Sequence, residues 1–231
     1  MVIATRERPG ERLLPWSEGA ASVINLDRHI GAFGPIFRGL MTAMFKRPTL
    51  IFLPALLLSG AAYGLFVGLA PLFGANVLGW GEDVYSGWSG QANLAAGVAG
   101  AVVFGFVAER WGARRMFVGA HLLTAVTAAI LLSLQPNWAA PTILIVAIFA
   151  FTAIQVLQQV TLSAVAMRCC APAVAATQFS LFMAVSNLGI SIAAASLGTL
   201  DRLGGMPAMV VAIIAVGVFG AAFAFAAKLG R

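Results

Sequence analysis

The chain has 231 residues, of which 61% are hydrophobic and only 10% are charged, and its mean hydropathy is +0.94. Soluble domains usually carry about 25% charged and about 45 to 50% apolar residues. The composition therefore excludes an ordinary water-soluble enzyme, because the apolar residues outnumber those that a fold of this size can hide from water.

The first 48 residues are the most polar part of the chain. No apolar run follows their first arginines, so residues 1–48 do not resemble a signal peptide. We expect a cytoplasmic linker with an amphipathic helix at about 33–46, where apolar residues recur every three or four positions beside basic ones. The alternative is a collapsed linker without this helix.

Charged residues after Lys46 occur only in short clusters, and the apolar stretches between the clusters are long enough to cross a bilayer as helices. Strands are excluded because no alternating segments occur and open sheet edges cannot be satisfied in lipid. We predict an all-α integral membrane domain at 49–227 and a cytoplasmic tail at 228–231, with Gly74 among the turn residues. The six predicted spans are Thr49–Phe73, Ser86–Ala108, Met116–Leu134, Pro141–Val165, Val174–Leu200 and Pro207–Ala227.

The basic residues predict the orientation. Of the 14 lysines and arginines, all but Arg202 fall on one side of the predicted topology. Because basic loops stay inside, we expect both termini in the cytoplasm, with the protein in a bacterial inner membrane. The pI of about 10.4 then reflects topology rather than nucleic-acid binding, since no basic face interleaved with aromatic residues is present.

The chain repeats itself weakly at an offset of 92 residues. The offset relates Thr49 to Pro141 and Gly97 to Gly189, and it aligns the loop 109–112 with the loop 201–204. Because each repeat holds three spans, the second triplet must be inverted in the membrane relative to the first. Inverted three-helix repeats are a known construction of secondary transporters.

Polar side chains inside the predicted spans indicate a cavity, since each needs a partner or water within the bilayer. A stripe of glutamines on the fourth span is the leading candidate, and the alternative is hydrogen bonding between helices. The predicted cavity residues are Tyr63, Asn93, Thr152, Gln155, Gln158, Gln159, Thr177, Gln178 and Asn187.

Small residues form two further ridges at four-residue spacing, which we expect to be helix-packing faces. The ridges are Gly60, Gly64 and Gly68 on the first span, and Gly97, Ala101 and Gly105 on the second.

Enzymatic chemistry is not predicted. No Asp, Glu, Lys or Arg lies within any predicted span, and His121 has no carboxylate or second histidine near it in sequence. We therefore expect no catalytic residues, metal or cofactor. His121 is a possible proton site, with a structural hydrogen bond as the alternative. For the adjacent Cys169 and Cys170 we expect packing, with soft-metal binding as the alternative.

One loop motif resembles a known family. Residues 105–115 resemble the G-x-x-x-D-R-x-G-R/K-R/K motif of the major facilitator superfamily, with Glu109 in place of Asp and Ala113 where a basic residue is common. The resemblance implies a cytoplasmic latch whose pairing depends on the transport state. The motif residues are Gly105, Glu109, Arg110, Gly112, Arg114 and Arg115.

Two further stretches, 12–19 and 167–181, resemble the AmpG-like branch of that superfamily, which contains muropeptide, siderophore and acetyl-CoA permeases. The resemblance implies that this chain is the carboxy-terminal six-helix half of a permease for a polar, muropeptide- or siderophore-like solute. Its expected partners are membrane lipid, the solute, and a second half supplied by a separate chain or a homodimer. The alternative is a non-transporting remnant or interaction subunit.

Overall fold

The computed structural model describes residues 33–227, and within that range it contains helices and no strand. The expected linker residues 1–32 and the tail 228–231 lie outside the described residues. The elements are α2 (Phe33–Met44), α3 (Arg47–Leu78), α4 (Glu82–Ala99), the π-helix η2 (Gly100–Phe104), α5 (Gly105–Trp111), α6 (Ala113–Ser133), η3 (Gln135–Asn137), α7 (Pro141–Cys169), η4 (Pro172–Val174) and α8 (Ala175–Ala226).

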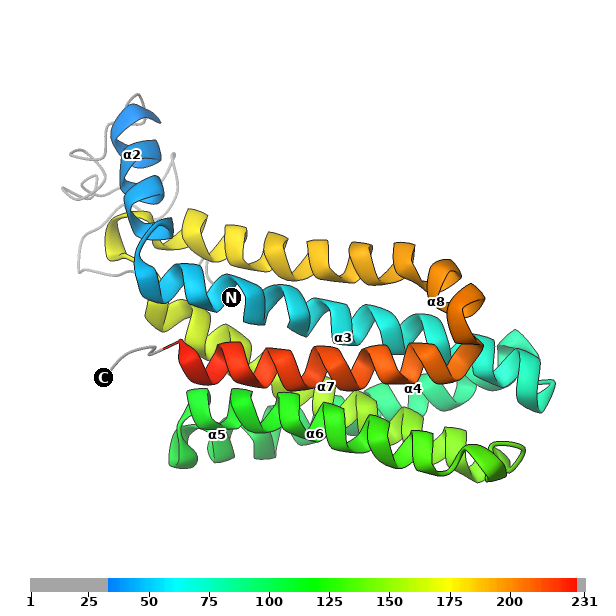
Figure 1. The fold of residues 1–231 in the computed structure, drawn as a ribbon. Helices are drawn as coiled ribbons and strands as arrows, with labels where there is room; N and C mark the ends of the chain where they lie inside the picture. Colours follow the sequence, from blue (N-terminus) through cyan, green and yellow to red (C-terminus); the bar gives the residue numbers. More distant parts are fainter. Residues whose placement is uncertain (1–32, 228–231) are drawn as a thin grey trace, which may run out of the picture.

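The segments α3, α4 with η2 and α5, α6, α7 and α8 run along one bundle axis (Figure 1). Among the described residues, five continuous helices are long and apolar enough to cross a membrane. They are α3, the combined helix of α4, η2 and α5, α6, α7 and α8, and α8 alone has 52 residues. It doubles back at Gly204-Gly205, where Gly205 has a φ of +63° that L side chains rarely adopt. We call residues 175–203 its first limb and 206–226 its second limb. The predicted all-α membrane fold with six spans is thus confirmed.

The first turn lies later in the chain than predicted. Gly74 was expected in a turn but is helical, and α3 continues to Leu78. The helix ends at Gly79, whose φ is +63°, while the N–H of Trp80 donates to the Gly74 carbonyl at 2.9 Å. The prediction was wrong because a glycine within a helix marks a turn only where the backbone must become left-handed.

The two ends of the bundle differ in charge. We call one end of the bundle the basic end. It is the end at which α3 and α6 begin and at which α5, α7 and α8 terminate (Figure 1). The opposite end carries three of the four described carboxylates, in the first turn of α4 and beside the α8 kink. Acidic residues in a first helical turn favour helix formation, which explains why α4 begins before the predicted Ser86. The described basic residues at the basic end are Arg38, Lys46, Arg47, Arg110, Arg114, Arg115 and Arg168.

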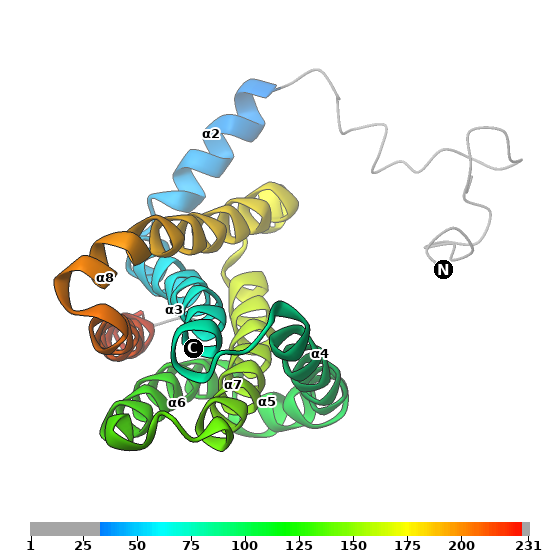
Figure 2. The same ribbon diagram turned by 90° about the vertical axis from the view of Figure 1, so that its right-hand side faces the viewer.

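Helices of the two triplets pack against each other, the first triplet being α3, α4 to α5, and α6, and the second being α7 and the two limbs of α8. The first helix of one triplet packs against the second helix of the other, so α3 lies along the first limb of α8 and α7 lies along α4 (Figure 2). A Cβ atom at Gly60 would overlap the carbonyl oxygen of Ser186, and one at Gly64 would lie 2.8 Å from that of Ile190. The ridge on α3 is therefore a packing face, as predicted.

The second ridge does not pack in the same way. A Cβ atom at Gly97 or at Gly105 would meet no atom within 4 Å. The close contact on this side uses Gly100 instead, where a Cβ atom would overlap the side chain of Val156 on α7. The prediction of a packing ridge through Gly97 and Gly105 is therefore wrong for the described bundle, in which Gly100, three positions after Gly97, is the glycine that meets α7.

Gln178 links α7 to α8. Its Oε1 accepts a hydrogen bond of 2.8 Å from the backbone N–H of Ala171, and its Nε2 donates to the Cys169 carbonyl at 3.4 Å. The side chain is fully buried, whereas its neighbour Thr177 is exposed. These bonds satisfy backbone groups that the end of α7 leaves without helical partners.

We expect Gln178→Ala to destabilise the protein by about 1 kcal/mol, because it leaves the partly buried backbone groups of Cys169 and Ala171 without their side-chain partner. Thermal unfolding of the purified protein in detergent measures the effect. Thr177→Ala is the matched control and should leave the melting temperature unchanged. Equal melting temperatures for the two variants would show that the Gln178 bonds do not hold the turn.

A polar cavity between the two triplets

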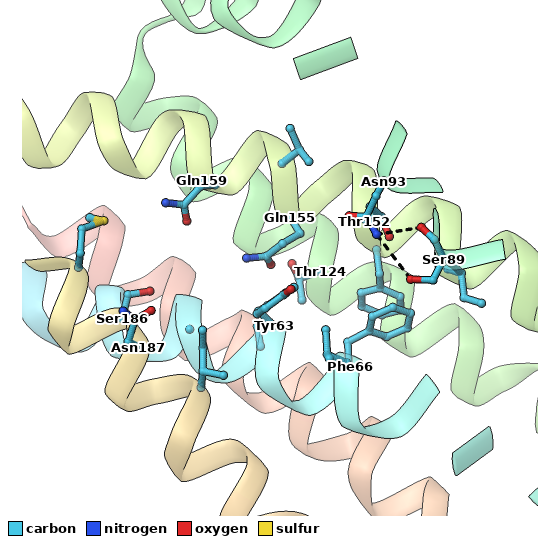
Figure 3. A pocket seen from close by; sticks show the side chains of 18 of the residues that line it. Tyr63, Phe66, Ser89, Asn93, Thr124, Thr152, Gln155, Gln159, Ser186 and Asn187 are labelled. Atoms are coloured by element: carbon cyan, nitrogen blue, oxygen red, sulfur yellow. Dashed lines mark hydrogen bonds between the residues drawn. The ribbon is translucent and has the colours of Figure 1, made fainter. Parts of the chain in front are cut away.

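A cavity of about 400 Å³ lies between α3, α4, α7 and the first limb of α8, with Thr124 contributed by α6 (Figure 3). Its walls carry amide, hydroxyl and phenol groups, and no charged residue is among them. A wall of this kind binds solutes through hydrogen bonds rather than ion pairs. The polar lining residues are Tyr63, Tyr85, Ser89, Asn93, Thr124, Thr152, Gln155, Gln159, Ser186 and Asn187.

The polar stripe of α7 forms one wall. Thr152, Gln155 and Gln159 line the cavity, as Figure 3 shows, because residues three and four apart share a helix face. Tyr63 faces them from α3, and Asn187 lies on the first limb of α8. Six of the nine predicted cavity residues, including Asn93, are thus brought together.

The repeat places equivalent positions of the two triplets on opposite walls. At an offset of 92, Gly60, Tyr63 and Val67 of α3 correspond to Thr152, Gln155 and Gln159 of α7, and all six residues line the cavity. The cavity therefore lies between the two inverted triplets, where the first helices of both face each other. Only the α7 side carries amides at these positions.

Helix α4 contributes more than was predicted. Tyr85, Ser89 and Asn93 follow one another at four-residue intervals and all line the cavity. The Nδ2 of Asn93 donates to the Ser89 carbonyl oxygen at 2.8 Å (Figure 3). Tyr85 and Ser89 were not among the predicted cavity residues, although counting back from Asn93 in steps of four reaches both. Tyr85 also lies outside the predicted span, which began at Ser86.

An aromatic pair closes part of the cavity wall. The rings of Phe66 on α3 and Phe151 on α7 stack with centroids 4.2 Å apart and planes 21° apart. Both are buried and both line the cavity. Because the pair forms between two helices, no single-helix pattern could have predicted it. Its flat, apolar surface complements the hydrogen-bonding groups on the other walls.

Three predicted cavity residues lie elsewhere. Thr177 and Gln178 lie in the first turns of α8 at the basic end, where the Gln178 side chain bonds the backbone after α7. Gln158 is fully buried between α7 and α6, and its Nε2 lies 3.0 Å from Nδ1 and 3.1 Å from Nε2 of His121. Gln158 was misplaced because one step along a helix turns a side chain by about 100°.

His121 lies outside the cavity as well. Its ring is fully buried and lies edge-on to the Phe117 ring, with the two ring centroids 4.8 Å apart. It fits against the second limb of α8 only because position 220 is glycine, where a Cβ atom would overlap the imidazole. The hydrogen bond to Gln158 places this residue in the interface between α6, α7 and α8.

The loop motif forms a tight turn at the basic end. Gly112 joins α5 to α6 with a φ of +88°, a conformation that favours glycine. Glu109 and Arg110 are exposed on α5. The Arg114 guanidinium donates to the Phe225 carbonyl and lies 5.9 Å from the centre of the Phe225 ring. In this structure Arg114 therefore ties α6 to the last turn of α8, and the described residues show no ion pair between Arg114 and Glu109.

The long apolar helices of the bundle and the polar cavity between them define an all-α integral membrane protein. Residues 1–194 match the family model of the Major Facilitator Superfamily. The chain therefore belongs to this superfamily of membrane transporters. No curated protein and no solved structure matches the chain.

Proposed function

We propose that the chain is one six-helix half of a secondary transporter, which moves a polar solute by alternating access. The observation that carries this proposal is the uncharged polar cavity between two inverted triplets of a major facilitator protein. Transporters built from inverted repeats bind substrate at the repeat interface and expose it alternately to the two sides. The cavity has that position relative to α3 and α7.

Muropeptides and siderophores are the solute types that we favour, as expected for an AmpG-like permease. The amides of Gln155, Gln159 and Asn93 can each donate and accept hydrogen bonds, as such hydroxyl- and amide-rich solutes require. The stacked rings of Phe66 and Phe151 add apolar surface to the cavity wall, which suits the less polar parts of such solutes.

Exposed polar groups support a second half. Tyr63, Asn93, Gln159 and Asn187 line the cavity yet remain exposed at the surface of the six-helix unit. Polar side chains are costly against lipid and usually face the interior of a bundle. A second six-helix unit, either another copy of this chain or a separate chain, would cover them and complete the cavity.

We also propose a bacterial inner membrane as the location, with the basic end of the bundle facing the cytoplasm. All described basic residues except Arg202 are at that end, in agreement with the positive-inside rule. The described chain enters the bundle at this end through α2 and leaves it there at the end of α8.

Uptake into proteoliposomes tests the proposal. The protein is reconstituted, its oligomeric state is measured in detergent, and uptake of a labelled muropeptide and a labelled ferric siderophore is compared with empty liposomes. A dimer, or the chain combined with a separate six-helix partner, should accumulate one of the two solutes. Folded protein that carries neither solute in either arrangement would favour the non-transporting alternative.

A further inference from the structure

Helix α2 lies at the basic end and runs across the bundle axis, as Figures 1 and 2 both show. One face holds it to the bundle: Leu40 is 8% exposed, Ala43 is 3% exposed, and a Cβ atom at Gly39 would touch Val174 of η4 at 3.4 Å. A helix that is anchored in this way at the end of a membrane-spanning bundle lies close to the plane of the membrane surface.

A second face of this segment is apolar and uncovered. Phe37, Met41 and Phe45 follow at four-residue intervals, and they are 64%, 38% and 65% exposed. Large apolar side chains on an interfacial helix are stable when they insert among lipid acyl chains. This apolar stripe therefore provides a contact for the hydrophobic part of a lipid.

A third face, beside the apolar stripe, is basic. Arg38, Thr42 and Lys46 also follow at four-residue intervals, and they line a cavity of about 560 Å³ together with Gly34, Gly39, Ala43 and Ala171. We call this cavity the α2 groove. It contains two cationic side chains and no carboxylate. The Thr42 hydroxyl already donates to the Arg38 carbonyl at 2.9 Å, so the two cations are the available donors.

We propose that the α2 groove binds the phosphate of an anionic phospholipid, with Arg38 and Lys46 contacting the headgroup and the acyl chains lying along Phe37, Met41 and Phe45. The argument is the adjacency of the two stripes. A soluble anion would need only the cations, and a neutral lipid would need only the apolar stripe, whereas an anionic phospholipid uses both. Basic pockets at the membrane surface bind such headgroups.

Native mass spectrometry of the full-length protein in detergent tests this site. The protein is titrated with palmitoyl-oleoyl phosphatidylglycerol and, separately, with the corresponding phosphatidylcholine. The Arg38→Gln/Lys46→Gln variant should bind phosphatidylglycerol about thirty-fold more weakly, since each basic residue near an anionic lipid surface contributes about 1 kcal/mol. Its binding of phosphatidylcholine should not change. Unchanged phosphatidylglycerol binding would overturn the proposal.

Two controls identify the ligand. The Arg47→Gln/Arg115→Gln variant removes the same charge from the same end, outside the groove, and should retain phosphatidylglycerol binding. An equal loss in this variant would indicate a diffuse charge effect and no site. Displacement of the lipid by inorganic phosphate or glycerol phosphate at equal concentration would indicate a soluble-anion site and would also overturn the proposal.

The apolar stripe has its own test. Phe37→Ser/Phe45→Ser should weaken the binding of both lipids to a similar extent, because it removes acyl-chain contacts and leaves the cations in place. Helicity measured by circular dichroism checks the fold of every variant. If the double charge variant loses helicity, Lys46→Gln alone, which lies between α2 and α3, should still weaken phosphatidylglycerol binding about fivefold.

Discussion

Replacing Gln155 and Gln159 together with alanine should reduce solute uptake by at least about tenfold while leaving the amount of folded protein unchanged. Both side chains line the cavity from the same face of α7. Without them, polar groups of the bound solute would lack hydrogen-bond partners, at a cost of about 1 to 3 kcal/mol for each unpaired group. Initial uptake rates in proteoliposomes, at equal amounts of reconstituted protein, measure the effect.

Gln91→Ala is the matched control for this prediction. Gln91 lies on α4, is exposed, and is not among the residues that line the cavity. The control variant should transport at the rate of the unchanged protein. If the Gln155→Ala/Gln159→Ala variant also transports normally, the α7 stripe is not a substrate surface, and its amides serve hydrogen bonding between helices instead.

The second large effect concerns the contact between α3 and α8. Gly60→Ala should destabilise the protein by about 1 to 3 kcal/mol, the usual cost of overpacking. The added methyl group would overlap the carbonyl oxygen of Ser186, a backbone atom that can move only if the two helices separate. Gly189→Ala should act similarly from the other helix, where its methyl group would overlap the Leu57 carbonyl oxygen.

Gly97→Ala provides the comparison for this prediction. Its methyl group would meet no atom within 4 Å, and alanine has the higher helix propensity by about 1 kcal/mol. This variant should be as stable as the unchanged protein or slightly more stable. Unfolding in mixed detergent, followed by circular dichroism, ranks the variants. Equal unfolding midpoints for Gly60→Ala and Gly97→Ala would show that the α3–α8 contact does not limit stability.

These two glycines show where prediction from the sequence reached its limit. Both occur in ridges with the same four-residue spacing, which predicts that the glycines of each ridge share a helix face. It does not reveal whether another helix faces the ridge. The ridge of Gly60 meets α8 closely, whereas a Cβ atom at Gly97 would meet no atom within 4 Å and Gly100 makes the close contact with α7 instead.

The glutamines show the same division within a single helix. The spacing of Gln155 and Gln159 predicts a shared face, and both line the cavity. Gln158 has the same side chain but points toward His121, because adjacent helical positions differ by about 100°. Residue type identified polar candidates, while the direction toward the cavity depended on which helices pack around α7.

The sequence by itself determined the class of this protein and its division into apolar helical spans. Hydropathy and the placement of charge act along the chain, and in a bilayer they leave helices as the only solution. Only the tertiary structure decided which polar residues share a cavity. The stacking of Phe66 on Phe151, the approach of Tyr63 to the α7 stripe and the inclusion of Ser186 all depend on contacts between helices far apart in sequence. Such contacts follow from how the inverted triplets exchange partners, which periodicity within one helix does not encode.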